Sequence, residues 1–153
     1  MRPTISEQLA GMRRILAEVV APEVTGAYAA DMLRGVLANL EMLERSWSRV
    51  APFLAWDNAG TERLLEAIAL HLDQTFAHRV EALLLTRPVD QVDVDVLDAH
   101  NTALRDLLAD AIPLLAAGGE RTAAIYEDVR GHLRERIDRF PLAMNAPMPG
   151  AAR

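Results

Sequence analysis

The residues of this sequence best suited to chemistry are two histidines and an aspartate that could share a metal ion: His100, Asp128 and His132. Asp128 and His132 are four residues apart, a spacing that places both side chains on one face of a helix. If that helix packs antiparallel to the one carrying His100, the three side chains approach one another, and zinc accepts both residue types as ligands. We favour the alternative that His100 is a hydrogen-bonded residue at the edge of the core, because the Glu-x-x-His pairs of di-iron bundles are absent.

Other catalytic chemistry finds little support in the sequence. The remaining histidines, His71 and His78, are seven residues apart, or about 10 Å along a helix, and are predicted to face solvent. The chain contains no cysteine and no lysine, which removes thiolate nucleophiles and Schiff-base chemistry. No Gly-x-Ser-x-Gly motif occurs. We therefore predict no catalytic residue and no cofactor, and a non-enzymatic protein is favoured over an enzyme.

Scarce aromatic residues could line an apolar ligand pocket between helices. The candidates are Tyr28, Trp47, Trp56 and Phe76, and Trp56 precedes Asp57 and Asn58, which could form a polar rim. The favoured alternative is that these side chains simply fill the core, because aromatic residues make up only 5% of the chain.

The elements that must position these residues are predicted helices. The longest covers about 25–50. Its apolar residues recur at steps of one, three and four and form one stripe, which other helices must cover. These residues are Met32, Leu33, Val36, Leu40, Leu43, Trp47 and Val50. Thr4 and Glu7 form a capping box, so a first helix begins near Ile5 and ends at Pro22. Pro52 is predicted to end the long helix, and Asp57-Asn58-Ala59-Gly60 is predicted to be a turn.

Three more helices are predicted in the second half of the chain, over about 62–85, 96–117 and 121–139. The segment 87–95 is predicted to be an extended connection in which Asp93 or Asp95 caps the next helix. Pro113 is expected to kink or break the helix over 96–117 near Asp110, and Gly118-Gly119 ends it. The sequence thus predicts an all-α, single-domain antiparallel bundle of about five helices over 1–143, with a loose C-terminal tail over 144–153.

Composition narrows the class of protein. A length of 153 residues with 51% hydrophobic content is typical of one ordered domain with a real core. The net charge of -6, with no run of basic residues, disfavours nucleic-acid and anionic-membrane partners. The N-terminus lacks the apolar core of a signal peptide, and no run of 18 apolar residues is present. We therefore expect a cytoplasmic protein.

Two stretches resemble a known family. The segments WDNAGTERLL, over 56–65, and IYEDVRGHLRERIDRFPL, over 125–142, resemble a bacterial family of uncharacterised short helical proteins. Members are typically encoded beside acyl-CoA dehydrogenases and aminoglycoside-phosphotransferase-like kinases. The resemblance covers about a third of the chain and implies an accessory or partner role near acyl-CoA metabolism or small-molecule phosphorylation. The family has no catalytic residues to transfer.

Association with another protein is the function that the sequence favours. Apolar residues flank the predicted stripes of two helices: Tyr28 and Leu37 on the first, Leu70 and Leu84 on the second. Extra apolar surface of this kind often forms a dimer or partner interface. We predict a homodimer or a complex with a protein partner. The alternatives are a metal-binding bundle enzyme and a carrier of an apolar or acyl ligand.

Overall fold

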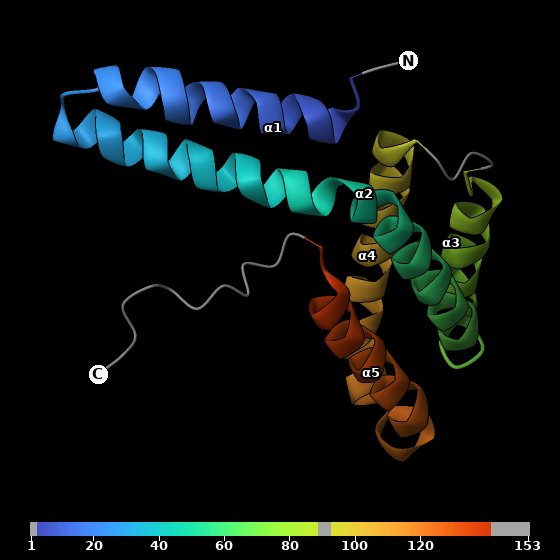
Figure 1. The fold of residues 1–153 in the computed structure, drawn as a ribbon. Helices are drawn as coiled ribbons and strands as arrows, with labels where there is room; N and C mark the ends of the chain where they lie inside the picture. The colour runs from blue at the N-terminus through green and yellow to red at the C-terminus, as the bar shows by residue number, and fades with distance from the viewer. Residues whose placement is uncertain (1–2, 89–92, 142–153) are drawn as a thin grey trace, which may run out of the picture. The chain divides into compact units, whose positions relative to one another are not determined.

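The computed structural model describes residues 3–88 and 93–141, and every regular element in these ranges is helical (Figure 1). This confirms the predicted all-α fold with five α-helices: α1 (Ile5–Ile15), α2 (Ala27–Ala69), α3 (Gln74–Leu85), α4 (Val94–Ala117) and α5 (Ala123–Arg139). A π-helix over Leu16–Val20 and a 3-10 turn over Ala21–Glu23 follow α1, and another 3-10 turn, Gly119–Thr122, precedes α5. No helix in the described ranges is long and apolar enough to cross a membrane. The predicted tail over 144–153 lies outside these ranges.

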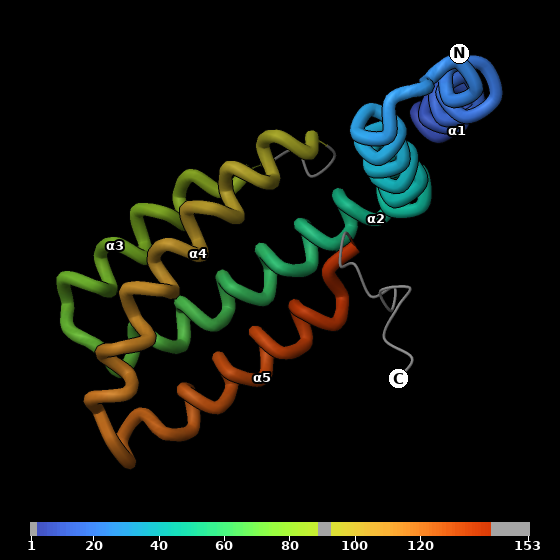
Figure 2. The backbone as a smooth tube through the Cα atoms, turned by 90° about the vertical axis from the view of Figure 1, so that its left-hand side faces the viewer, coloured from blue at the N-terminus to red at the C-terminus, as the bar shows by residue number. Residues whose placement is uncertain are grey.

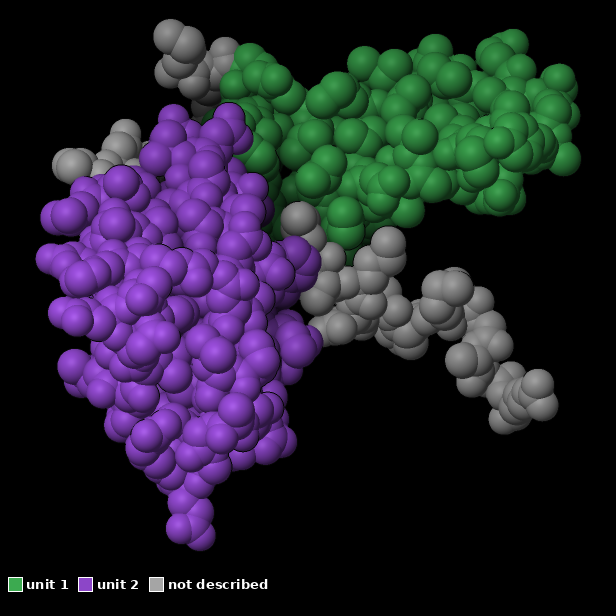
Figure 3. Space-filling view, turned by 180° about the vertical axis from the view of Figure 1, so that it is seen from behind, with its two compact units in different colours: residues 1–49, 141–153 green, residues 50–140 purple. Residues whose placement is uncertain are grey.

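The chain divides into two compact units where we predicted one bundle over 1–143 (Figure 3). Unit 1 comprises residues 1–49 and 141–153, and unit 2 comprises residues 50–140. Helix α2 contributes to both, with 27–49 in unit 1 and 50–69 in unit 2.

The start of the chain matches its prediction. The Thr4 side chain accepts from the Glu7 backbone N–H at 3.2 Å, and the Glu7 carboxylate accepts from the Thr4 N–H at 2.7 Å, which completes the capping box of α1. Pro22 lies in the 3-10 turn that closes this helical stretch. Within unit 1, α1 and residues 27–49 of α2 then run side by side as an antiparallel hairpin, joined by an ion pair of Arg13 with Glu44 at 3.1 Å (Figures 1 and 2).

The prediction that Pro52 ends the long helix is wrong, because α2 continues through it to Ala69. Proline removes one backbone donor, which leaves the carbonyl of Ser48 without its helical partner. Ser48 and Pro52 are both exposed, so water can hydrogen-bond to that carbonyl. The prediction of a turn over 57–60 is wrong as well, because these residues are helical.

The prediction of one helix over 62–85 is also wrong. This stretch is divided between the end of α2 and α3, with a break over 70–73. Asp73 is the N-cap of α3, where its carboxylate accepts from the Phe76 N–H at 2.8 Å. Further on, Asp93 caps α4 as predicted, and Gly119 follows α4 with a φ of 60°, which glycine adopts without strain. Helix α4 runs through Pro113 without interruption, so the helix does not break near Asp110.

The hydrophobic core belongs to unit 2. Its four helical segments, the end of α2 together with α3, α4 and α5, pack side by side (Figure 2). Five apolar residues of α4 are buried on its inner side: Leu97, Leu104, Leu108, Ala111 and Leu115. The last four pack with Leu65 and Ile68 of α2 and with Val129 of α5. Leu97 packs instead with Phe53 and Leu54 of α2. On α5, Ile137 is exposed.

The stripe of the long helix is not covered as predicted. Among the described residues of 3–49, only Ser46 is buried. Met32, Val36, Leu43 and Trp47 are each at least 36% exposed. The apolar stripe that we expected to organise the fold therefore lies largely on the surface of unit 1.

The first prediction tests where the core lies. Leu104, with 0% exposure, and Leu114, with 48%, are leucines of the same helix. Leu104→Ala should lower the free energy of unfolding by about 2–5 kcal/mol, because it opens a cavity in the core of unit 2. Leu114→Ala should change it by less than about 1 kcal/mol. Urea unfolding followed by circular dichroism measures both, and equal effects would contradict this placement of the core.

Candidate functional site

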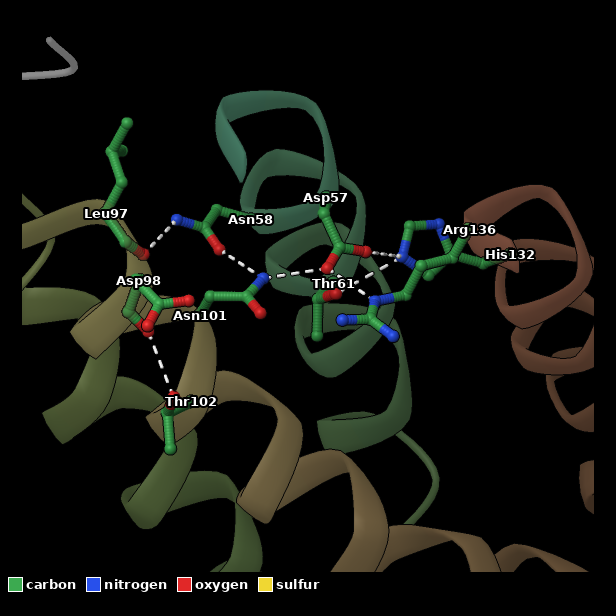
Figure 4. Close-up of polar contacts among 9 residues, drawn as sticks. All are labelled: Asp57, Asn58, Thr61, Leu97, Asp98, Asn101, Thr102, His132 and Arg136. Atoms are coloured by element: carbon green, nitrogen blue, oxygen red, sulfur yellow. Dashed lines mark hydrogen bonds and ion pairs between the residues drawn. The ribbon is translucent and has the colours of Figure 1, made fainter. Parts of the chain in front are cut away.

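Asp57 is a carboxylate with 0% exposure on the part of α2 that belongs to unit 2 (Figure 4). Its Oδ1 accepts from Nε2 of His132 at 3.1 Å. Its Oδ2 accepts from Nε of Arg136 at 2.7 Å and from Nδ2 of Asn101 at 2.7 Å. Since Asp57 lies on α2, Asn101 on α4 and the other two partners on α5, one carboxylate connects three helices.

Asn58 and Thr61 extend this arrangement. Asn58 donates from Nδ2 to the Leu97 carbonyl at 3.0 Å and accepts from Asn101 at 2.7 Å. Oγ1 of Thr61 lies 3.2 Å from Nε2 of His132. Asp57, Asn58, Thr61, Asn101, His132 and Arg136 together are called the Asp57 network here. Asp, Asn and Thr usually disfavour a helix interior because their side chains compete for backbone groups. These side chains instead bond to α4 and α5, which is why the predicted turn over 57–60 is helical.

The Asp57 network does not form a nucleophilic triad. Nε2 of His132 contacts both the Asp57 carboxylate and the Thr61 hydroxyl. A carboxylate only accepts, so Nε2 must carry the proton that it donates to Asp57. It therefore cannot take a proton from Thr61, whereas a triad needs one ring nitrogen for the carboxylate and the other for the nucleophile.

The hydrogen-bond partners of Asp57 keep its carboxylate ionised. Burial raises the pKa of this carboxyl, but the hydrogen bonds from His132, Arg136 and Asn101, with the charge of Arg136, outweigh burial and lower it to about 2. Asp57 is thus ionised at neutral pH and contributes a stabilising, fully paired charge.

Gly60 leaves room for His132. A Cβ atom at position 60 would lie 2.4 Å from Cε1 of the His132 ring. The same ring packs against Trp56, with centroids 5.2 Å apart. A glycine inside a helix costs about 1 kcal/mol relative to alanine, and here it permits the approach of α5 to α2.

A second polar cluster contains His100. Its Nε2 lies 2.8 Å from Oε1 of Glu62, and Oε2 of Glu62 pairs with Arg87 at 2.8 Å. His100 and Glu62 are buried, whereas Arg87 is exposed. A cavity of about 30 Å³ adjoins them, which has room for water but not for an organic substrate.

The structure does not bring the predicted metal ligands to one point. His100 pairs with Glu62, His132 pairs with Asp57, and Asp128 is exposed on α5. Within 3–88 and 93–141, no group of three or more His, Asp or Glu side chains could hold a metal ion. The favoured alternative describes His100 correctly, since it is a buried, hydrogen-bonded histidine. His71 and His78 are exposed, as predicted.

The predicted aromatic pocket is also not assembled. Tyr28 is 79% exposed on unit 1 and Trp47 is partly exposed there, whereas Phe76 is buried in the core of unit 2. Trp56 packs against Phe53, His132 and the guanidinium of Arg139. None of the four lines the small cavity or the open groove of about 390 Å³ that α2 and α3 form in unit 2.

The remaining candidate is the apolar surface of the hairpin in unit 1, here called the hairpin face. It consists of eight large apolar residues with exposures between 36% and 63%: Ile5, Met12, Ile15, Val19, Met32, Val36, Leu43 and Trp47. Half of them come from α1 and the π-helix after it, and half come from α2.

Helix geometry places these residues on one side of the hairpin. Counting about 100° per residue, the four on each helix fall within a stripe about 80° wide or less. The half-buried leucines, among them Leu9, Leu16, Leu33 and Leu40, mark the seam between the helices. Each exposed stripe lies roughly a quarter turn from that seam. Because the helices are antiparallel, both stripes fall on the same side.

Comparison with known proteins gives no match for this chain. The chain matches no family, no curated protein and no solved structure. The function must therefore be argued from the residues and the geometry.

The second prediction concerns the close approach at Gly60. Gly60→Ala should lower the free energy of unfolding by about 1–3 kcal/mol, because the new methyl group displaces the His132 ring. Gly35→Ala is the matched control on the same helix, where a Cβ meets nothing within 4 Å. It should instead stabilise by about 0.5–1 kcal/mol. Urea unfolding of both variants checks the contrast, and a stabilised Gly60→Ala protein would contradict it.

The third prediction follows from the pKa of Asp57. The folded-state pKa of about 2 lies below the ordinary aspartate pKa of 3.8, so this group stabilises the fold above about pH 4 and the contribution is lost as the pH falls toward 2. The contribution is about 2–3 kcal/mol. Asp57→Asn should destabilise the protein at pH 7 and flatten the decline in stability between pH 4 and 2. Urea unfolding across this pH range measures the free energy of unfolding of each protein, and the exposed Asp128→Asn is the control. Parallel pH profiles of stability for Asp57→Asn and wild type would refute the prediction.

Proposed function

We propose that this protein is a non-enzymatic helical protein that works by association, with the hairpin face as its binding surface. The observation that carries the proposal is the exposure of eight large apolar residues on one side of a hairpin. Contiguous apolar surface on a folded protein is costly in water, and its common purpose is to be covered by another protein surface.

The polar clusters of unit 2 support this choice over an enzyme. Within the described part of the chain, every buried side-chain nitrogen and oxygen has a hydrogen-bond partner. Saturated groups of this kind hold helices together, whereas a catalytic group needs access to a substrate. The cavity beside Glu62 and His100 is too small to admit one. Unit 2 therefore serves as the packed part of the protein, and unit 1 offers the surface for association.

An accessory role near acyl-CoA metabolism is what the sequence resemblance implies, and it is compatible with a protein that acts by binding. Under this proposal the partner carries out the chemical reaction, and this chain provides a surface that binds the partner. A location in the cytoplasm, expected from the sequence, belongs to the same proposal.

The fourth prediction tests whether the hairpin face is covered in cells. A photoreactive benzoylphenylalanine placed at Val36, on the face, should form a covalent adduct with another polypeptide on irradiation. The same residue at Ala38, which is exposed about 200° around the helix, is the control and should form little or none. Denaturing gels of irradiated cells show the adducts. Absence of any adduct at Val36 and at Met12 would overturn the proposed function.

A further inference from the structure

We infer that the occupant of the hairpin face is the same face of a second copy of this chain, so that two hairpins form a four-helix bundle. This inference rests on the proposed function and names its partner. It is carried by four features of the hairpin: the lack of buried side chains in the described residues of 3–45, the spacing of its apolar residues, its balance of charge and its size.

The hairpin lacks a core of its own. In the described residues of 3–45 no side chain is buried, although the α1 stretch and the first part of α2 are rich in leucine, isoleucine, valine and methionine. Two helices can bury only the seam between them, and a stable all-α arrangement needs a further layer on the apolar side. A second hairpin supplies two helices of the right length and the right chemistry at once.

The apolar residues have the spacing of helices that pack in bundles. On the first stretch, Ile5, Leu9, Met12, Leu16 and Val19 follow steps of four, three, four and three. On α2, Val36, Leu40, Leu43 and Trp47 follow steps of four, three and four. This is the heptad pattern whose side chains interdigitate between nearly parallel or antiparallel helices. One partner that carries the matching pattern on two helices is this hairpin itself.

The charge of the hairpin favours a copy of itself over a strongly charged partner. Residues 1–49 contain six arginines and six acidic residues, so this part of the chain is neutral, while the whole chain carries a formal charge of -6. Several of these charges are already paired within the hairpin, Arg13 with Glu44, Arg34 with Asp31 and Arg45 with Glu41. Two neutral surfaces meet without net repulsion, whereas an acidic or basic partner would find no complementary field here.

The size of the hairpin also fits. It spans 45 residues from Ile5 to Arg49, and the hairpin face runs from Ile5 to Val19 on the first stretch and from Met32 to Trp47 on α2. A stable interface uses about 20–30 residues from each partner. In a two-fold dimer the same patch acts on both subunits, so one apolar face is sufficient to close the assembly.

The fifth prediction tests the second copy directly, on the full-length purified protein. Sedimentation equilibrium should give twice the chain mass at micromolar concentration. Val36→Glu should raise the dimer dissociation constant by at least about tenfold, because a dimer would bury two extra carboxylates. Ala38→Glu is the matched control and should leave the dimer unchanged. Circular dichroism confirms that both variants remain helical.

A disulfide scan gives an independent readout, since the chain contains no cysteine. Single cysteines introduced at Met12, Val36 or Leu43 should yield a covalent dimer on oxidation from at least one position near the two-fold axis, and Ala38→Cys should not. A monomer at all concentrations, or a dimer that Val36→Glu leaves intact, would overturn the second-copy inference. If Val36 or Met12 then still forms photoadducts of a different mass in cells, the proposed function stands with another partner; if neither position forms one, both fail.

Discussion

The buried charge of Asp57 is the constraint on which the packing of unit 2 depends. A carboxylate with no exposure must be fully paired or it would destabilise the fold by several kcal/mol. Its partners come from α4 and α5, so the three helices can pack only in the register that satisfies it. The apolar contacts around it stabilise the unit, and the network selects one arrangement among those that apolar packing alone would allow.

The same network explains local features that otherwise contradict helix rules. Asp57, Asn58 and Thr61 are tolerated in a helix because their hydrogen-bonding groups are used by other helices. Gly60 is tolerated because a larger residue would meet His132. Among the described residues of 3–49, no such network and no buried apolar side chain holds the hairpin, and its apolar side is the surface that we assign to association.

Much of the fold could be predicted from local patterns. The capping box at Thr4, the cap at Asp93 and the inward stripe of α4 all follow from rules that operate within one turn or one face of a helix. The break before Asp73 was missed because the apolar spacing continues through it from Ile68 to Phe76. A signal was present nonetheless, since an aspartate three residues before Phe76 is an ordinary N-cap.

The candidate sites show where local rules end. By itself the sequence determined the helical class and most helix ends. Only the tertiary structure decided that α2 runs through Pro52, that His100 pairs with Glu62 and that His132 pairs with Asp57. Those pairs join residues 38 and 75 positions apart. Helix periodicity shows which residues share a face of one helix. Which faces of two helices contact each other depends on packing across the whole unit.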